Sequence, residues 1–105
     1  NAVQAMMRAA PADRPDALLV TSDVLVPYAT AGLLAVGAKV PRQVEVVAFG
    51  NFPDPTPSMV PARRVGFRPR DILQTAIQAI DNQRSGKPHL STWTIPGNFE
   101  EDFSL

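Results

Sequence analysis

The chain has 105 residues, with ten basic and ten acidic side chains and no cysteine. A chain of this length forms one domain at most, and its balanced charge does not favour binding of nucleic acid or of a membrane by this segment. The lack of cysteine excludes a disulfide framework, a thiolate nucleophile and a Cys-based zinc site.

The first third of the sequence predicts a helix, a strand and a second helix. Apolar residues at i, i+3, i+4 and i+7 predict a short helix over 3–10, which Pro11 ends. The run ALLVTS, residues 17–22, does not alternate, which is typical of a parallel strand covered on both faces. A second helix is expected to extend to about Val36 and to stop at Gly37, because glycine adopts the left-handed conformation without strain.

The start of this second helix combines a capping signal with a proline. Ser22 or Thr21 is expected to cap the helix, with Asp23 in the first turn, where the helix dipole favours an anion. Pro27 lies near the end of the first turn, so we expect a kinked or delayed start.

The next part of the chain predicts two further strands and a helix. Val44–Phe49 is an apolar run typical of a buried strand, and 51–61, with its four prolines, predicts an irregular loop. A third strand is expected over 62–67. A third helix is expected to begin at Pro69 and to end at Gly86.

The tail suggests one more strand. Its alternating run places Trp93 and Ile95 on the same side. With this strand, helices and strands alternate along the chain, and the connections are typical of a parallel sheet. The sequence therefore predicts the α/β class.

Enzymatic motifs are missing, and the candidate catalytic side chains are isolated. The sequence has no G-x-G-x-x-G, P-loop, G-x-S-x-G or H-E-x-x-H motif. His89 is the only histidine and is expected to be an exposed loop residue. Glu100, Glu101 and Asp102 offer paired carboxylates, but three consecutive acids in a tail are typical of a solvated segment. We therefore expect no enzyme, no cofactor and no metal site.

Two long segments carry a family resemblance. ALLVTSDVLVPYATAGLLAVGAKVPRQVEVVAFGNF and VPARRVGFRPRDILQTAIQAIDNQRSGKP resemble the C-terminal part of the effector-binding domain of LacI/GalR-type transcription regulators, over about residues 15–88. The resemblance implies a three-layer, parallel-sheet fragment of a type I periplasmic-binding-protein-like domain. It would comprise second-lobe elements (1–67), a crossover helix region (68–92), and a return strand with the tail (93–105).

The resemblance also implies where a ligand would bind. In this family two lobes hold a small polar effector at the carboxyl ends of their strands. The matching positions are Ser22, Gly50 and Phe67, while Asp23 keeps the family identity, with helix capping as its simplest role. Gly50 stands where the family has a carboxylate, and Asn51 supplies an amide instead.

These replacements do not identify the chemical class of the effector. Phe67 either stacks on a ligand ring or packs in the protein. The chain then binds a less hydroxylated or more aromatic ligand than a sugar, or it has lost effector binding.

For the parent protein, the resemblance implies a bacterial, cytoplasmic transcription regulator. Its ligand would modulate DNA binding by an N-terminal helix-turn-helix head that these 105 residues do not contain; the start at Asn1 without methionine predicts a cut piece. No apolar run approaches the roughly 20 residues of a membrane span, and no signal-peptide pattern is present. The alternatives are a piece of a periplasmic sugar- or solute-binding protein for transport, and a flavodoxin-like enzyme or interaction module.

A homodimer is the expected assembly. The family dimerises through the helix after the first of these strands and through the loop before the third. The corresponding apolar positions are Val24, Leu25, Pro27, Tyr28 and Met59. The alternative is that Leu25 and Tyr28 pack into the chain's own core. A second exposed apolar surface, which favours self-association, is expected on the helix at 70–84. In the family the first lobe covers the apolar stripe of this helix, and that lobe is not present here.

Overall fold

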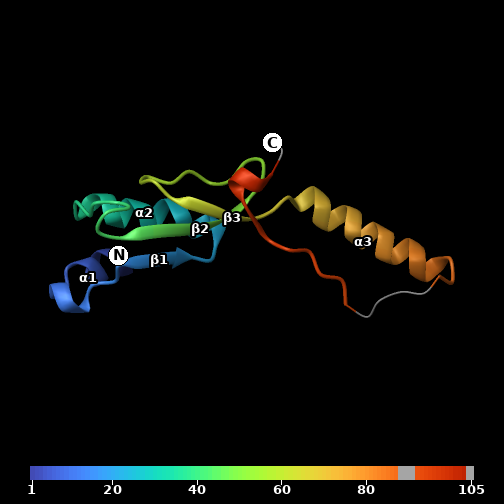
Figure 1. Ribbon diagram of the computed structural model, residues 1–105, viewed down its shortest axis with the longest axis horizontal. Helices are drawn as coiled ribbons and strands as arrows, with labels where there is room; N and C mark the ends of the chain where they lie inside the picture. The colour runs from blue at the N-terminus through green and yellow to red at the C-terminus, as the bar shows by residue number, and fades with distance from the viewer. Residues whose placement is uncertain (88–91, 104–105) are drawn as a thin grey trace.

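The computed structural model describes residues 1–87 and 92–103 (Figure 1). Its α-helices and strands are, in order, α1 (Ala2–Met7), β1 (Ala17–Val20), α2 (Val26–Ala35), β2 (Glu45–Asn51), β3 (Arg63–Phe67), α3 (Pro69–Arg84) and β4 (Asn98–Phe99). Short 3₁₀ helices lie at Pro11–Asp13, Asp23–Leu25 and Glu100–Asp102. His89, with residues 88–91, lies outside the described residues.

The strands form one open sheet in the order β1-β2-β3-β4. β1, β2 and β3 are parallel, whereas β4 is antiparallel to β3. The register pairs Val20 with Ala48 and Gly50 with Gly66. The predicted α/β class is confirmed, and the first three strands end at the same edge of the sheet.

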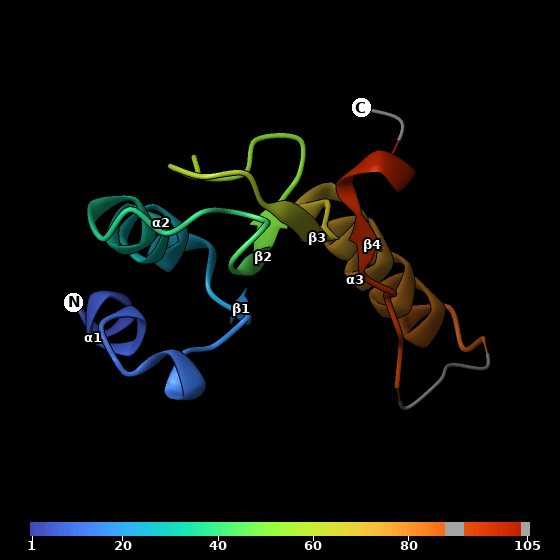
Figure 2. The same ribbon diagram turned by 60° about the vertical axis from the view of Figure 1, so that its left-hand side comes forward.

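One face of this sheet carries the core. α1 and α2 both lie on that face (Figure 2). Leu33 of α2 packs there with residues of α1 and β2, and it is completely buried. In β2 the even-numbered Val46 and Ala48 are buried, while Val47 and Phe49 are only partly buried. Since side chains alternate along a strand, Val47 and Phe49 belong to the opposite face.

That opposite face lacks a covering helix among the described residues. Leu19 of β1 is 62% exposed, so the expectation that the 17–22 strand is covered on both faces is wrong. The predicted third layer is not formed by the part of the chain that the structure describes. The reason is that α3 continues beyond the carboxyl ends of the strands instead of folding back onto them (Figure 1).

The extended position of α3 makes the molecule long. It measures 60 × 26 × 20 Å, and its radius of gyration of 18.2 Å exceeds the roughly 13 Å of a compact chain of this length. α3 has no buried residue. Leu73, Ile77 and Ile80 are all more than half exposed. The apolar stripe of this helix is therefore not covered by the described residues of the chain.

Several local predictions are confirmed. The second helix has the delayed start expected from Pro27, because a 3₁₀ turn at Asp23–Leu25 precedes α2. Gly37 and Gly86 follow their helices with φ of 69° and 70°. Pro69 is the first residue of α3.

The predicted strand at Trp93 and Ile95 is wrong. Residues 92–97 have no strand structure, and the tail pairs with β3 only at Asn98 and Phe99. Pro96 has no N–H to donate to a ladder, and glycine at position 97 weakens a strand. Pairing therefore begins only after these two residues.

Candidate functional site

The carboxyl ends of β2 and β3 lie side by side. Asn51 is the register partner of Phe67, and the backbone N–H of Phe52 donates to the carbonyl oxygen of Phe67 at 2.8 Å. Of the residues predicted to bind a ligand, these two are brought together directly by the parallel pairing.

Ser22 and Asp23 lie at the turn between β1 and α2. The Ser22 side chain makes no capping hydrogen bond. The Asp23 carboxylate accepts from the Thr56 N–H at 3.2 Å, and the Thr56 hydroxyl lies 2.6 Å from the Asp23 backbone oxygen and 3.0 Å from its carboxylate. The predicted side-chain cap from Ser22 or Thr21 is therefore not formed. Asp23 lies in the first turn as predicted, but the hydrogen bonds that its carboxylate accepts come from Thr56 of the proline-rich loop.

Gly50 is buried beneath the same loop. A Cβ at this position would lie 3.0 Å from the Cβ of Pro55 and 3.8 Å from the ring of Phe52. Pro55 therefore lies against the space that any side chain at position 50 would need. Glycine is the residue that lets the loop lie close to the end of β2.

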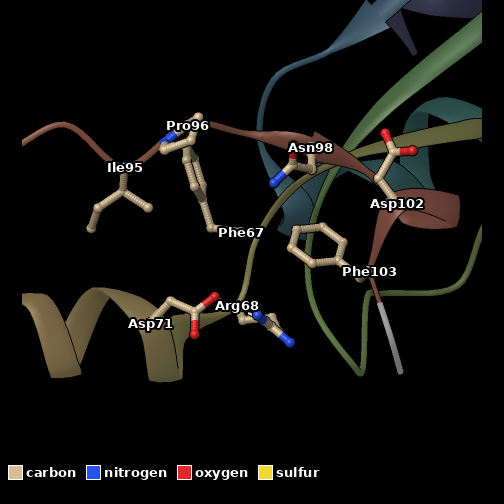
Figure 3. A pocket seen from close by; sticks show the side chains of 8 residues that line it. All are labelled: Phe67, Arg68, Asp71, Ile95, Pro96, Asn98, Asp102 and Phe103. Atoms are coloured by element: carbon tan, nitrogen blue, oxygen red, sulfur yellow. Dashed lines mark hydrogen bonds and ion pairs between the residues drawn. The ribbon is translucent and has the colours of Figure 1, made fainter.

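A cavity of about 410 Å³ opens at the end of β3 (Figure 3). One wall comes from the junction between β3 and α3, and the other comes from the tail. The lining residues are Phe67, Arg68, Asp71, Ile95, Pro96, Asn98, Asp102 and Phe103. We call this cavity the junction pocket. Ser22, Asp23, Gly50 and Asn51 do not line it.

Arg68 is the one positively charged residue among those that line the junction pocket. Its Nε donates to Asp71 Oδ2 at 2.8 Å, and its guanidinium lies 5.3 Å from the centroid of the Phe103 ring. Arg68 has extended backbone just before α3, and Asp71 lies in the first turn. The Arg68 charge is therefore already matched by Asp71 and stacked on an aromatic ring.

Aromatic rings extend from the pocket into the sheet. Phe67 is tilted against Phe49 with centroids 5.9 Å apart, and Phe103 against Phe52 at 4.8 Å. Phe52 is only 2% exposed. Its burial anchors the Phe103 side of the pocket, because aromatic pairs at these distances attract each other beyond simple burial.

Two ion pairs connect the tail wall to β3. Arg63 Nη2 lies 2.8 Å from Glu101 Oε1, and Arg64 Nε lies 3.8 Å from Glu100 Oε2. A backbone hydrogen bond, and secondly the hydrogen bond from Arg63, lower the pKa of Glu101. Glu100, Glu101 and Asp102 are all exposed, as expected for a solvated segment. The ion pairs of the two glutamates lie at the surface, where such pairs contribute little to stability.

Four of the five predicted dimer residues are exposed. The Met59 N–H donates to the Thr30 hydroxyl at 3.0 Å, so the loop carrying Met59 is attached to α2. Val24 and Tyr28 are 67% and 70% exposed. The predicted dimer residues are Val24, Leu25, Pro27, Tyr28 and Met59. Leu25 is 54% exposed, so Leu25 and Tyr28 do not pack into the core of this chain.

No group of three or more His, Cys, Asp or Glu residues is placed to hold a metal ion within residues 1–87 and 92–103. In the same part of the chain, no helix has the length and apolar character needed to cross a membrane.

Comparison with protein-family models, with curated proteins and with solved structures yields no match to this chain.

Sequence reasoning missed most of the junction pocket. Arg68 directly follows the third strand, so the rule that strand ends meet ligands would have included it. No sequence signal places Asn98 or Phe103 there. Their position depends on the chain turning back after α3 and pairing along the edge of β3.

Proposed function

We propose that this chain is part of the effector-sensing and dimerisation domain of a LacI/GalR-like transcription regulator. The observation that carries the proposal is the junction pocket, which lies at the carboxyl end of a parallel strand, where open α/β sheets bind their ligands. Its lining includes Phe67, one of the positions that the family resemblance assigns to ligand binding.

The position of the pocket supports a switching mechanism. Phe67 ends β3, Arg68 follows it, and α3 begins at the next residue. A molecule bound between this junction and the tail contacts both the sheet and the first turn of α3. Its binding energy therefore favours one orientation of α3 over others, which is the requirement for coupling a ligand to a rigid-body change.

DNA binding by the parent protein provides the test. The 105-residue chain has equal numbers of acidic and basic side chains, so we expect it to show no sequence-specific DNA binding. We expect the protein encoded by the full reading frame to bind a specific operator through an upstream head. Fluorescence anisotropy titrations of both proteins at moderate salt measure this.

Two results would contradict the proposal. Specific binding by the 105 residues alone would place DNA recognition in this segment. A full-length protein that has a cleaved signal peptide and no DNA affinity would indicate a transport protein instead.

The exposed apolar surface of α2 supports the dimer in this proposal. Val24, Tyr28 and Met59 lie on neighbouring segments that the Met59–Thr30 hydrogen bond holds together. Several large apolar side chains exposed on adjoining segments more often mark a protein contact than a solvated surface. We propose that Tyr28 lies near the axis of a homodimer formed by this surface.

Tyr28→Asp is expected to dissociate this dimer. The substitution places a charge in an apolar contact, where its desolvation is unfavourable. Sedimentation equilibrium at tens of micromolar should show a dimer for the wild type and a monomer for the variant. Leu34→Asp is the matched control, since Leu34 is 60% exposed on the same helix but lies outside the proposed contact. A monomeric wild type, or equal behaviour of both variants, would contradict this interface.

A further inference from the structure

Two apolar surfaces of this chain have no covering element among residues 1–87 and 92–103. One is the sheet face opposite α1 and α2 (Figure 2). The other is the stripe of α3, which has no buried residue and consists of Ile72, Leu73, Ala76, Ile77 and Ile80. A helix with one apolar stripe and a sheet with one uncovered apolar face are the two components of a standard α/β layer.

The uncovered sheet face is formed by alternate residues of the three parallel strands. We call it the bare face, and its apolar residues are Leu19, Val47, Phe49 and Val65. The register aligns Leu19 with Val47 and Phe49 with Val65, so these side chains form two adjoining rows. Leu19 is exposed and the other three are only partly buried. The bare face therefore leaves apolar surface in contact with water in a single chain.

The connection between β3 and α3 is too short for α3 to cover the bare face of its own chain. Arg68 alone separates the two elements. As the residue before Pro69 it is restricted to extended conformations, and its φ of −93° and ψ of 119° lie in that region. A helix that packs back onto its sheet needs a loop of about two to six residues to reverse the chain. α3 therefore continues past the carboxyl ends of the strands (Figure 1).

The direction and length of α3 fit the bare face of a second copy. In a twofold pair whose carboxyl ends face each other, the strands of the second copy run against the direction of α3. The helix then lies antiparallel to these strands, as the crossover helices of parallel sheets do. α3 has 16 residues and β2 has 7, and at about 1.5 and 3.3 Å per residue each is about 23–24 Å long.

The charges at the far end of this arrangement are complementary. Glu45 begins β2 and alternates with Val46, so it lies on the bare face, where it is exposed. Arg84 is the last residue of α3 and is also exposed. Neither residue forms an ion pair within the described parts of the chain. An antiparallel α3 brings Arg84 to the amino ends of the strands, which is where Glu45 of the second copy lies.

We infer that two copies of this chain exchange α3, so that the stripe of each helix covers the bare face of the other copy. The inference goes beyond the proposed function, because it assigns surfaces other than the Tyr28 contact. A reciprocal exchange removes four apolar surfaces from water within one closed dimer. The Tyr28 contact is compatible with the same dimer, since α2 and α3 both begin near the carboxyl ends of the strands.

Ile77→Asp tests the contribution of the stripe. Ile77 is mostly exposed in the single chain, so the substitution leaves the packing within that chain unchanged. We expect the dissociation constant of the dimer, from sedimentation equilibrium, to rise about tenfold or more, because each copy loses a buried aliphatic side chain and buries a charge. Gln78→Asp places the same charge on the opposite side of α3 and should change the constant by about twofold at most. Circular dichroism of both variants checks that α3 stays helical.

Cross-linking identifies the surface that receives α3. The chain has no cysteine, so single introduced thiols report contacts between copies. A Leu19→Cys chain is mixed with an Ile77→Cys chain under mild oxidation, and we expect the mixed disulfide to exceed its statistical share. Leu34→Cys is the matched control, because Leu34 is as exposed as Leu19 but belongs to α2, on the other side of the sheet. With Ile77→Cys it should give no excess.

The possible failures are distinguishable. A wild-type dimer that Tyr28→Asp dissociates and Ile77→Asp does not weaken would overturn the exchange and leave the Tyr28 contact in place. Preferred coupling of Ile77→Cys to itself would show that two stripes pack on each other, and mixed disulfides no more frequent with Leu19→Cys than with Leu34→Cys would exclude the bare face. Either result would overturn the inference. A wild-type chain that remains monomeric would overturn both the exchange and the proposed homodimer.

Discussion

Gly66→Ala is expected to destabilise the protein by about 3 kcal/mol or more. Gly66 is buried and pairs with Gly50 in the centre of the sheet. A Cβ at position 66 would overlap the carbonyl oxygen of Gly50 and crowd the rest of that peptide. Because the obstacle is backbone and not a flexible side chain, it moves only if β2 and β3 separate. Urea unfolding followed by circular dichroism measures the loss of stability.

Gly97→Ala is the matched control for this substitution. A Cβ at Gly97 would meet the Phe67 ring at 3.7 Å, which is an ordinary van der Waals contact. We expect a change in the free energy of unfolding within about 0.5 kcal/mol, as for other surface substitutions. A Gly66→Ala variant as stable as Gly97→Ala would show that β2 and β3 are not paired in this register.

Leu33→Ala is expected to destabilise the protein by about 2–5 kcal/mol. Leu33 is completely buried in the core that α2 forms with α1 and β2. Truncation removes its apolar contacts and leaves a cavity between α1, α2 and β2. The free energy of unfolding from urea titration is the measurement.

The neighbouring residue provides the control for the core. Leu34 is 60% exposed, so Leu34→Ala makes the same chemical change without opening a cavity. We expect an effect below about 0.5 kcal/mol. Equal effects of the two variants would contradict the packing of α2 on this face of the sheet.

The sequence by itself predicted the elements whose signals are local. Pro27 delays the start of α2, Pro69 begins α3, and Gly37 ends α2 with a positive φ. These outcomes depend on the conformational limits of a single residue, so neighbours in sequence are sufficient to predict them. The apolar runs likewise predicted the three parallel strands, and hence that Asn51 and Phe67 end at one edge.

Only the tertiary structure decided which side chains share the site. Gly50 lies under Pro55, and Asp23 binds Thr56, because the loop that follows β2 folds over the ends of both β1 and β2. The tail wall of the junction pocket depends on pairing between Val65 and Phe99, across the whole length of α3. The lack of a third layer among residues 1–87 and 92–103 has the same origin. The apolar stripe of α3 indicates that the helix can pack against a partner, but it does not determine where the helix lies. Such contacts depend on loop paths and chain reversals, which no local residue pattern encodes.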